Sequence, residues 1–306
     1  MKFKYLLLPF VCFAFVACEK DPFVPERPAT PAPDTIKVEQ PGGVNPGQPV
    51  TEGDDSHMLL GNPDGAQYSV LSASKYLMNQ TYFVESYNNS RGTPNWVSWH
   101  LVAADYATGS RNDSFRPDPN LPMGFYAVGA NSYSGSGFDR GHNCPSGDRT
   151  SNSTANRATF LMTNMIPQSP NNNQKSWATL ENYIRSEFAS KGKECFIIMG
   201  AYGKGAAGSN GYAETVDNGH VTVPKQVWKI VVAIAAGNND LSRIDANATV
   251  LAVDTPNDQN TIGSANDNWK KYVTTIAAIE SATGYSFLTT LPENTRTALK
   301  SKVYVP

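Results

Sequence analysis

The feature that most constrains the fold of this chain is a series of short β-type runs that do not alternate regularly with helices. The runs are rich in Val, Ile, Phe and Trp, are bounded by Gly, Pro and Asn, and cover residues 95–102, 124–128, 159–165, 194–199, 221–223, 227–235 and 249–253. The pattern favours an α+β fold, with a mostly antiparallel β-sheet core flanked by helices, over a doubly wound parallel sheet.

The clearest helix is predicted over residues 174–191, because apolar side chains recur there at helical spacing and Gly192 follows as a stop signal. These apolar side chains are Trp177, Leu180, Ile184 and Phe188. Residues 269–279 and 293–300 are two further helical candidates.

The N-terminus has the organisation of an export signal. Lys2 and Lys4 precede an apolar run over residues 5–16, which is shorter than the roughly 20 residues that a membrane span needs. The run ends in Phe15-Val16-Ala17-Cys18, a string similar to a bacterial lipoprotein cleavage box. We therefore expect a lipoprotein-type signal peptide at 1–17 and a lipid on Cys18; an ordinary secretory signal is the alternative, and both export the protein.

Residues 18–55 are predicted to be a disordered tether behind the lipidated Cys18. Residues 19–55 hold eight of the 21 prolines and four glycines and show hardly any apolar periodicity, so they cannot bury enough surface to fold. Residues 56–306 are long enough to form one large domain. We expect the protein to be anchored in the bacterial cell envelope, at the periplasmic face or at the cell surface.

The charge balance excludes a global basic field. The formal net charge is −2, and removing Lys2 and Lys4 with the signal makes it about −4. Any anion must therefore be bound locally. The four cysteines are too few for a disulfide-dense scaffold or a zinc ribbon; Cys144 and Cys195 are predicted either to pair or to remain buried thiols.

A G-x-G-x-x-G string at residues 203–208 is interpreted as a flexible surface loop rather than a nucleotide site. The string is followed by Ser209-Asn210-Gly211, which is turn chemistry and does not open the helix that a pyrophosphate site needs.

Residues 138–149 (FDRGHNCPSGDR) carry the first set of chemically active side chains. Arginines suit contacts to phosphate, and histidine can take a proton near neutral pH. The alternative is a polar surface loop in which the histidine only makes hydrogen bonds. The other histidines, His57, His100 and His220, lack this context and are expected to be structural.

A second segment, residues 160–181, passes from a β-like run through Pro167 and Pro170 and an asparagine cluster into the predicted helix. Asn173 lies at or just before the helix start, where its amide oxygen could bind Mg²⁺ or its side chain could simply cap the helix. Glu181 and Arg185 are four residues apart and share a helix face.

Together these segments resemble the DNA/RNA non-specific endonuclease family, the Serratia-type nucleases of the ββα-metal (His-Me finger) class. The family's D-R-G-H signature stands at Asp139-Arg140-Gly141-His142, and a P-S-x-D-R pattern follows from Pro145 to Arg149. The second block stands as residues 163–168 followed by Asn173, Trp177, Leu180, Glu181 and Arg185. Weaker similarity extends over most of residues 57–290.

The resemblance implies a ββα-metal active site in which His142 is the general base and Asn173 the direct ligand of one Mg²⁺, for which Mn²⁺ can substitute. Glu181 would hold a metal-bound water. Arg140 and an upstream arginine would steady phosphate charge; Arg111 fits the family pattern better than Arg116. Arg185 and Gln168 are further candidates for substrate contact.

The implied activity is hydrolysis of DNA and/or RNA phosphodiester bonds to 5′-phosphate products, and the family allows a homodimer. Two other interpretations remain at this point. One is a catalytically silent surface lipoprotein that binds nucleic acid or another partner with a nuclease fold, and the other is a structural surface lipoprotein.

Overall fold

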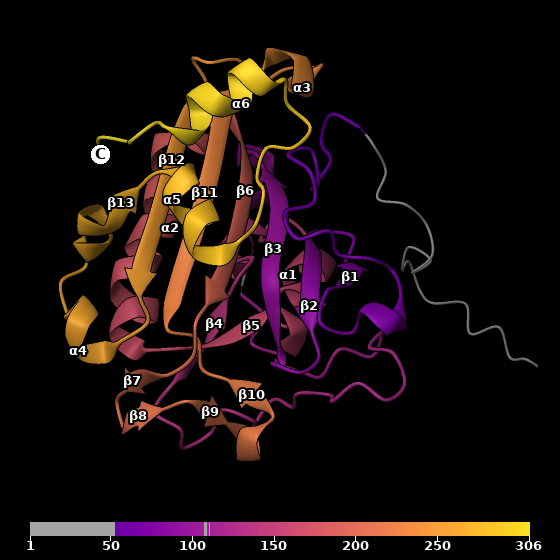
Figure 1. Cartoon of the computed structure of the whole chain (residues 1–306), viewed down its shortest axis with the longest axis vertical. Coiled ribbons are helices and arrows are strands. Elements are labelled where there is room, and N and C mark those ends of the chain that lie inside the picture. Colours follow the sequence, from indigo (N-terminus) through magenta and orange to yellow (C-terminus); the bar gives the residue numbers. More distant parts are fainter. Residues whose placement is uncertain (1–52, 107–108, 110) are drawn as a thin grey trace, which may run out of the picture. The chain divides into compact units, whose positions relative to one another are not determined.

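A seven-stranded antiparallel sheet forms the centre of the protein in a computed structural model, which describes residues 53–106, 109 and 111–306 (Figure 1). The strand order is β1-β2-β3-β6-β11-β12-β13, and every neighbouring pair is antiparallel. The predicted α+β class with an antiparallel core is thereby confirmed. The strands are β1 (Tyr76–Asn79), β2 (Val84–Asn88), β3 (Thr93–Leu101), β6 (Lys193–Tyr202), β11 (Gln226–Ala235), β12 (Thr249–Pro256) and β13 (Val273–Thr274).

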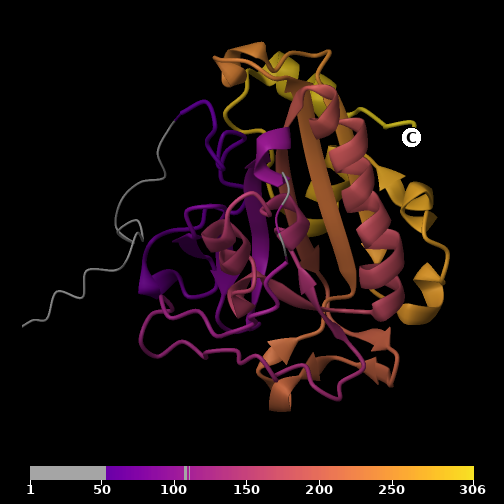
Figure 2. The same cartoon turned by 180° about the vertical axis from the view of Figure 1, so that it is seen from behind.

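Helices cover both faces of this sheet, so its central strands are apolar on both sides. On β11, Trp228, Ile230 and Val232 face one core cluster, and the intervening Val231 and Ala233 face the other. The first cluster is closed by α5 (Ile276–Thr283) and α6 (Glu293–Lys300), and the second by α2 (Ala178–Glu187) (Figures 1 and 2).

The helical run predicted over 174–191 is confirmed, although it is not uniformly α-helical. It begins as a π-helix at Asn172–Trp177, continues as α2 and ends as a 3₁₀ turn at Ala189–Lys191. Gly192 ends it with a left-handed φ of 76°, which glycine adopts at little cost. Leu180 and Ile184 are buried against the sheet, and each contributes about 1.5–3 kcal/mol.

A separate two-stranded hairpin lies next to this run. β4 (Asp139–His142) pairs antiparallel with β5 (Met165–Gln168), with His142 opposite Met165 and Asp139 opposite Gln168. The helical run follows β5 after a short loop, so the local order is strand, strand, helix. This is the ββα arrangement that the two sequence segments predicted.

Four local predictions were wrong. Residues 124–128 form no strand, and in the run 159–165 only Met165 belongs to a strand, because the chain there completes a helix and makes a 3₁₀ turn at Met162–Asn164. The helix expected at 269–279 is split by the short strand β13. Residues 203–208 are not a flexible loop but lead into a hairpin of β7 (Ala206–Gly208) and β8 (Gly211–Ala213).

The remaining elements are short. They are β9 (Thr215–Val216), β10 (Val221–Thr222), α1 (Ser153–Ala158), α3 (Asp240–Arg243), α4 (Gln259–Ile262), and 3₁₀ turns at Val70–Ser72, Ala103–Tyr106, Ser146–Asp148, Asp217–Gly219 and Asn268–Tyr272. Among the described residues, no helix combines the length and the apolar character required to cross a bilayer. The predicted signal peptide, Cys18 and nearly all of the tether lie outside the described residues.

Cys144 and Cys195 are both buried and both free in the structure, which agrees with the buried-thiol alternative. Burial raises the pKa of each thiol well above its usual value. Neither thiol is therefore a reactive thiolate near neutral pH.

His57 is held as a neutral imidazole. Its Nδ1 accepts a hydrogen bond from the His100 backbone N–H at 3.1 Å, and its Nε2 donates to the Thr81 carbonyl at 3.1 Å. Burial, and next the charge of Arg149, lower the pKa of His57 to about 3. The unfolded chain therefore binds a proton at His57 between about pH 6.5 and pH 3 that the folded chain does not.

We predict that the free energy of unfolding falls as the pH is lowered from 6.5 and that His57→Gln makes this fall less steep. One such histidine contributes a slope of at most about 1.4 kcal/mol per pH unit. Denaturant titrations at pH 7, 6 and 5 measure the slope. His220→Gln, which changes an exposed histidine, is the control and should keep the wild-type slope; equal slopes for His57→Gln and wild type would contradict the prediction.

Candidate active site

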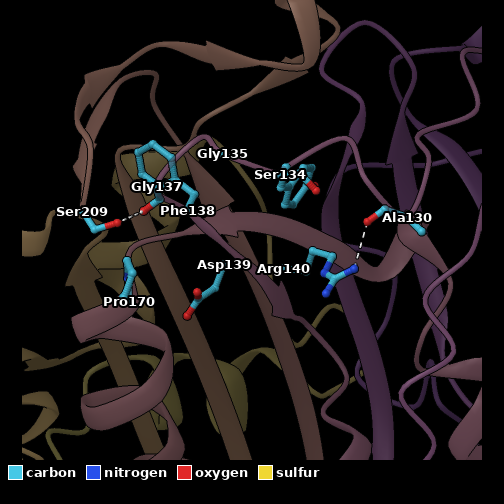
Figure 3. Close-up of a pocket in the computed structure, with 10 residues that line it drawn as sticks. Ala130, Ser134, Gly135, Gly137, Phe138, Asp139, Arg140, Pro170 and Ser209 are labelled. Atoms are coloured by element: carbon cyan, nitrogen blue, oxygen red, sulfur yellow. Dashed lines mark hydrogen bonds between the residues drawn. The ribbon is translucent and has the colours of Figure 1, made fainter.

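The β4 strand carries two of the predicted site residues, Arg140 and His142, together with Asp139 of the D-R-G-H string. Asp139 and Arg140 are consecutive, so their side chains leave opposite sides of the strand, as Figure 3 shows. His142 stands at the end of the same strand. Pairing with β5 fixes the backbone from which all three side chains project.

The His142 imidazole packs against two phenylalanine rings. Phe160 stands edge-on at 4.9 Å between centroids, and Phe115 lies at 5.6 Å. The Nε2 atom is buried and has no hydrogen-bond partner among the described residues. Burial first, and then the charges of Arg111 and Arg140, lower the pKa of His142 to about 3. The imidazole is therefore neutral near pH 7.

The same two rings carry the two arginines. The Arg140 guanidinium lies over the Phe115 ring at 3.8 Å, and the Arg111 guanidinium lies over the Phe160 ring at 5.1 Å. Arg140 Nη1 donates to the Ala130 carbonyl at 2.9 Å. Arg111 Nη1 donates to Ser146 Oγ at 2.9 Å. Each phenylalanine ring thus contacts both the histidine and one of the two guanidinium groups.

Arg116 is directed elsewhere. Its Nη1 donates to the backbone carbonyls of Ser114 and Arg157, at 3.2 and 2.8 Å. Of the two upstream arginines that the sequence offered, Arg111 is therefore the one that the structure brings to the histidine.

A hydrogen bond connects the start of the helical run to β4. Asn173 Nδ2 donates to Asp139 Oδ2 at 2.8 Å, and Gln174 Nε2 donates to the same oxygen at 2.9 Å. No described residue donates to Asn173 Oδ1. The carboxylate thereby orients the amide of Asn173. The amide nitrogen is used in the hydrogen bond to Asp139, and the amide oxygen is free to bind a ligand.

The π-turns at the start of the run also decide whether Asn173 and Glu181 lie on the same face of the helix. In a regular α-helix, residues eight apart are rotated by about 80° beyond two full turns. A π-turn takes up one extra residue, so eight residues correspond to about seven α-helical steps, or roughly 20° short of two turns. Asn173 and Glu181 consequently project from nearly the same side of the run.

Glu181 faces a buried lysine. Lys229 Nζ lies 3.4 Å from Glu181 Oε1 and also approaches the rings of Trp177 and Trp99, at 4.9 and 5.4 Å. The Lys229 side chain is only 2% exposed. Burial raises the pKa of Glu181, whereas the charge of Lys229 and then that of Arg185 lower it. The lysine therefore favours the ionised carboxylate.

The structure departs from the sequence-based expectation for two residues. Arg185 donates from Nη1 to Asp148 and from Nη2 to Asn182 Oδ1, so its charge is used inside the protein. Gln168 was expected to contact substrate, yet its side chain is fully buried and donates to Asn172 Oδ1 at 2.9 Å. A Cβ on Gly141 would lie 2.2 Å from Gln168 Oε1, which explains the glycine of the D-R-G-H string.

Asn164 is a residue that sequence reasoning did not single out, although it lies in the second segment. Its Oδ1 accepts from the Cys144 backbone N–H, and its Nδ2 donates to the carbonyls of Cys144 and Thr159, all at 2.9 Å. These bonds hold the backbone just after His142. The phenylalanine pair was missed as well, because isolated aromatic residues carry no distinguishing sequence signal.

A pocket of about 290 Å³ opens beside β4. Asp139, Arg140 and Pro170 line it together with the Gly-rich loop that ends at Phe138, as Figure 3 shows. The hydrogen bond from Arg140 to the Ala130 carbonyl crosses one wall. The pocket therefore adjoins both the Asp139–Asn173 contact and the Arg140 guanidinium.

The side chains here fit a hard divalent cation. The amide oxygen of Asn173 and the carboxylate of Glu181 are oxygen donors on nearly the same side of one helical run, and Mg²⁺ prefers such donors. The amide oxygen is also the atom of Asn173 that no described residue engages.

The chain matches the model of the DNA/RNA non-specific endonucleases over residues 63–294. It belongs to this family. The protein is therefore an enzyme, a nuclease of a metal-dependent family that acts on DNA or RNA, and the silent-binding and structural interpretations are set aside.

Relatives support this assignment. A nuclease of Nostoc sp. (strain PCC 7120 / SAG 25.82 / UTEX 2576) is 46% identical over 247 residues, which span 81% of this chain and 85% of that protein. The mitochondrial nuclease of Saccharomyces cerevisiae is 27% identical over 259 residues, spanning 81% and 76%. The crystal structure of the EndoG/EndoGI complex matches with a TM-score of 0.58 at 20% identity, covering 72% of this chain and 88% of that one, which shows a shared fold.

We predict that Asp139→Ala lowers nuclease activity by about 10–100-fold, because Asn173 loses the acceptor that orients its amide. Nicking rates of supercoiled plasmid measure the loss. Gln174→Ala is the matched control, since it removes the other donor to the same oxygen and should cost little. Wild-type rates in Asp139→Ala would contradict the positioning role.

Proposed function

We propose that this protein is a Mg²⁺-dependent, sugar-non-specific endonuclease that cleaves phosphodiester bonds of DNA and RNA and leaves 5′-phosphates. The observation that carries the proposal is the His142 imidazole, neutral and packed between two phenylalanine rings that each bear an arginine. A neutral imidazole near two cations suits the removal of a proton from water next to a phosphate.

His142 acts as the general base. Its Nε2 is buried, so Nδ1 is the ring nitrogen that water can approach, and Nδ1 takes the proton from the attacking water. Binding of a phosphate anion offsets the charges of Arg111 and Arg140, which contribute to the low pKa of His142. Substrate binding thereby makes the imidazole a stronger base at the moment it is needed.

Arg140 and Arg111 stabilise the negative charge that develops on the pentacovalent phosphorus. Their guanidinium groups are held by the aromatic rings and by hydrogen bonds to the protein, from Arg140 to the Ala130 carbonyl and from Arg111 to Ser146 Oγ and to Asp113 Oδ1. They are thus oriented before substrate arrives, and little reorganisation is needed during the reaction.

Asn173 Oδ1 would bind Mg²⁺ directly, and Glu181 would hold it through water. When bound, the ion acts as a Lewis acid toward the phosphate and the departing 3′ oxygen. Asp139 fixes the Asn173 amide, and the charge of Lys229 opposes the burial that raises the pKa of Glu181. Mn²⁺, with the same preference for oxygen donors, would substitute.

The substrate range follows from the nucleophile. Attack by water needs no ribose 2′-OH, so both DNA and RNA are suitable substrates. The pocket beside Asp139 and Arg140 offers room for a part of the nucleic acid next to the scissile phosphate. Phosphate contacts carry no sequence information, which agrees with cleavage that ignores sequence.

The N-terminal segment gives the proposed location. A lipoprotein-type signal at 1–17, a lipid on Cys18 and the tether behind it would display the nuclease domain in the bacterial cell envelope. The domain, predicted to start at residue 56, also includes Asp54, which accepts hydrogen bonds from the backbone at the start of α3. A homodimer is part of the proposal.

We predict that EDTA, His142→Ala and Asn173→Ala each abolish nicking of supercoiled plasmid and of structured RNA. The loss for His142→Ala should be about 10²–10⁴-fold. The controls are His220→Ala and Asn247→Ala, because His220 lies outside the site and Asn247 is an exposed asparagine that bonds to Asp245. If His142→Ala keeps wild-type activity, the assignment of His142 as the general base is wrong. If cleavage is undiminished in EDTA, the assignment of a catalytic metal ion is wrong.

We also predict that activity falls steeply with salt. The net charge of −2 leaves substrate affinity to a few local phosphate contacts, which counterions weaken. Rates on duplex DNA at 25 and 150 mM NaCl test this. A rate that does not change with ionic strength would contradict the prediction.

A further inference from the structure

A second cluster of potential metal ligands lies far from the candidate active site, at the end of the large sheet next to α3. Asp55, His100, Glu194 and Asp240 each offer one ligand atom, and these atoms lie within 4.8 Å of one another. Figure 1 shows α3 at one end of the sheet, while β4 and β5 lie toward the other. We call this group the α3 cluster.

The hydrogen bonding of His100 in this cluster is incomplete. Nε2 lies 3.2 Å from Glu194 Oε2, and Nδ1 lies 3.6 Å from Asp55 Oδ1. A neutral imidazole has one N–H donor and one lone pair. The Nε2 contact with Glu194 uses one ring nitrogen, and the other nitrogen faces Asp55 beyond hydrogen-bond distance, which leaves it available to a cation.

The carboxylates of the cluster are also under-neutralised. Glu194 and Asp240 are 3% and 0% exposed, and both accept from Arg243 Nη2. The two buried carboxylates and the guanidinium leave a charge of −1, to which the exposed Asp55 adds a further −1. Asp240 Oδ2 is buried without a hydrogen-bond partner among the described residues. A buried charge of this kind is costly unless a cation compensates it.

The α3 cluster also joins parts of the chain that are distant in sequence. His100 lies on β3, Glu194 on β6 and Asp240 at the start of α3, whereas Asp55 comes from the first described residues. The neighbouring Asp54 accepts hydrogen bonds from the backbone N–H groups of Asn239 and Asp240, at 2.7 and 3.1 Å. The segment that carries Asp55 is thus held against α3 independently of any ion.

We infer that the α3 cluster binds a divalent transition-metal ion, Zn²⁺ or Mn²⁺, through His100, Glu194, Asp240 and Asp55. The imidazole nitrogen favours these ions over Mg²⁺ and Ca²⁺, which take oxygen ligands. The ion supplies the two missing positive charges and fastens the start of the folded chain to β3, β6 and α3. This site is structural and does not depend on the proposed function.

The test uses Asn173→Ala protein freed of metal with a chelator, which removes the direct ligand of the proposed catalytic ion. Titration calorimetry at pH 7.5 with ZnCl₂ and with MnCl₂ measures binding, and Tm measures stabilisation. We expect one site, and a rise in Tm of roughly 3–5 °C at ten times Kd. Adding Asp55→Asn should weaken binding by about 10–100-fold. Asp55 is 84% exposed, so this variant keeps the fold.

Glu214→Gln in the same background is the matched control, because it removes an exposed carboxylate whose partner is Lys204, far from the cluster. It should bind as the parent does. Equal affinity in the Asp55→Asn and Glu214→Gln proteins would overturn the inference. So would a Tm that neither ion changes, which would leave the α3 cluster as a set of ion pairs and hydrogen bonds without a metal.

Discussion

The hydrogen bond from Asn173 to Asp139 joins the two halves of the nuclease site. Asp139 belongs to a strand that contributes Arg140 and His142, and Asn173 belongs to the helical run that contributes Glu181. The carboxylate orients the amide and fixes the register between hairpin and helix. The bond forms only because larger forces bring both elements to the same place, namely the pairing of β4 with β5 and the burial of α2 against the sheet.

The asparagine cluster before α2 shows how that place is fixed. Asn171 binds Gln259 near α4, and Asn172 donates to Thr255 and to the Pro256 carbonyl on β12. Asn257 in turn holds the backbone at Pro167 and Ser169. Two of three consecutive asparagines thus anchor the start of the helical run to the main sheet, and the third faces the site. The asparagine side chains of this segment therefore position the helical run as well as supplying a candidate metal ligand.

Buried charges are handled differently at the two ends of the molecule. At the nuclease site, the cations Arg111 and Arg140 lie on aromatic rings beside a neutral histidine, and Lys229 is enclosed by two tryptophans next to Glu181. Arg111 also pairs with Asp113 and Lys229 with Glu181, whereas Arg140 has no carboxylate ion-pair partner among the described residues and can receive a phosphate anion. At the α3 cluster the excess charge is negative and faces an imidazole, which suits a cation. Each local imbalance therefore indicates the sign of its ligand within a chain of nearly neutral net charge.

The sequence by itself determined the class of fold and the long helix with its glycine stop, and its family resemblance proposed the ββα segment with His142, Asn173 and Glu181. These features depend on local periodicity and on side chains that are close along the chain. The tertiary structure decided that Gln168 is buried and that Arg185 pairs with Asp148, and it added that Arg111, which the family pattern already favoured, lies over Phe160 beside the histidine. It also decided which phenylalanines desolvate His142 and that residues 55, 100, 194 and 240 converge. These outcomes depend on contacts between residues far apart in sequence, and such contacts are set by packing geometry, which leaves no periodic trace in the chain.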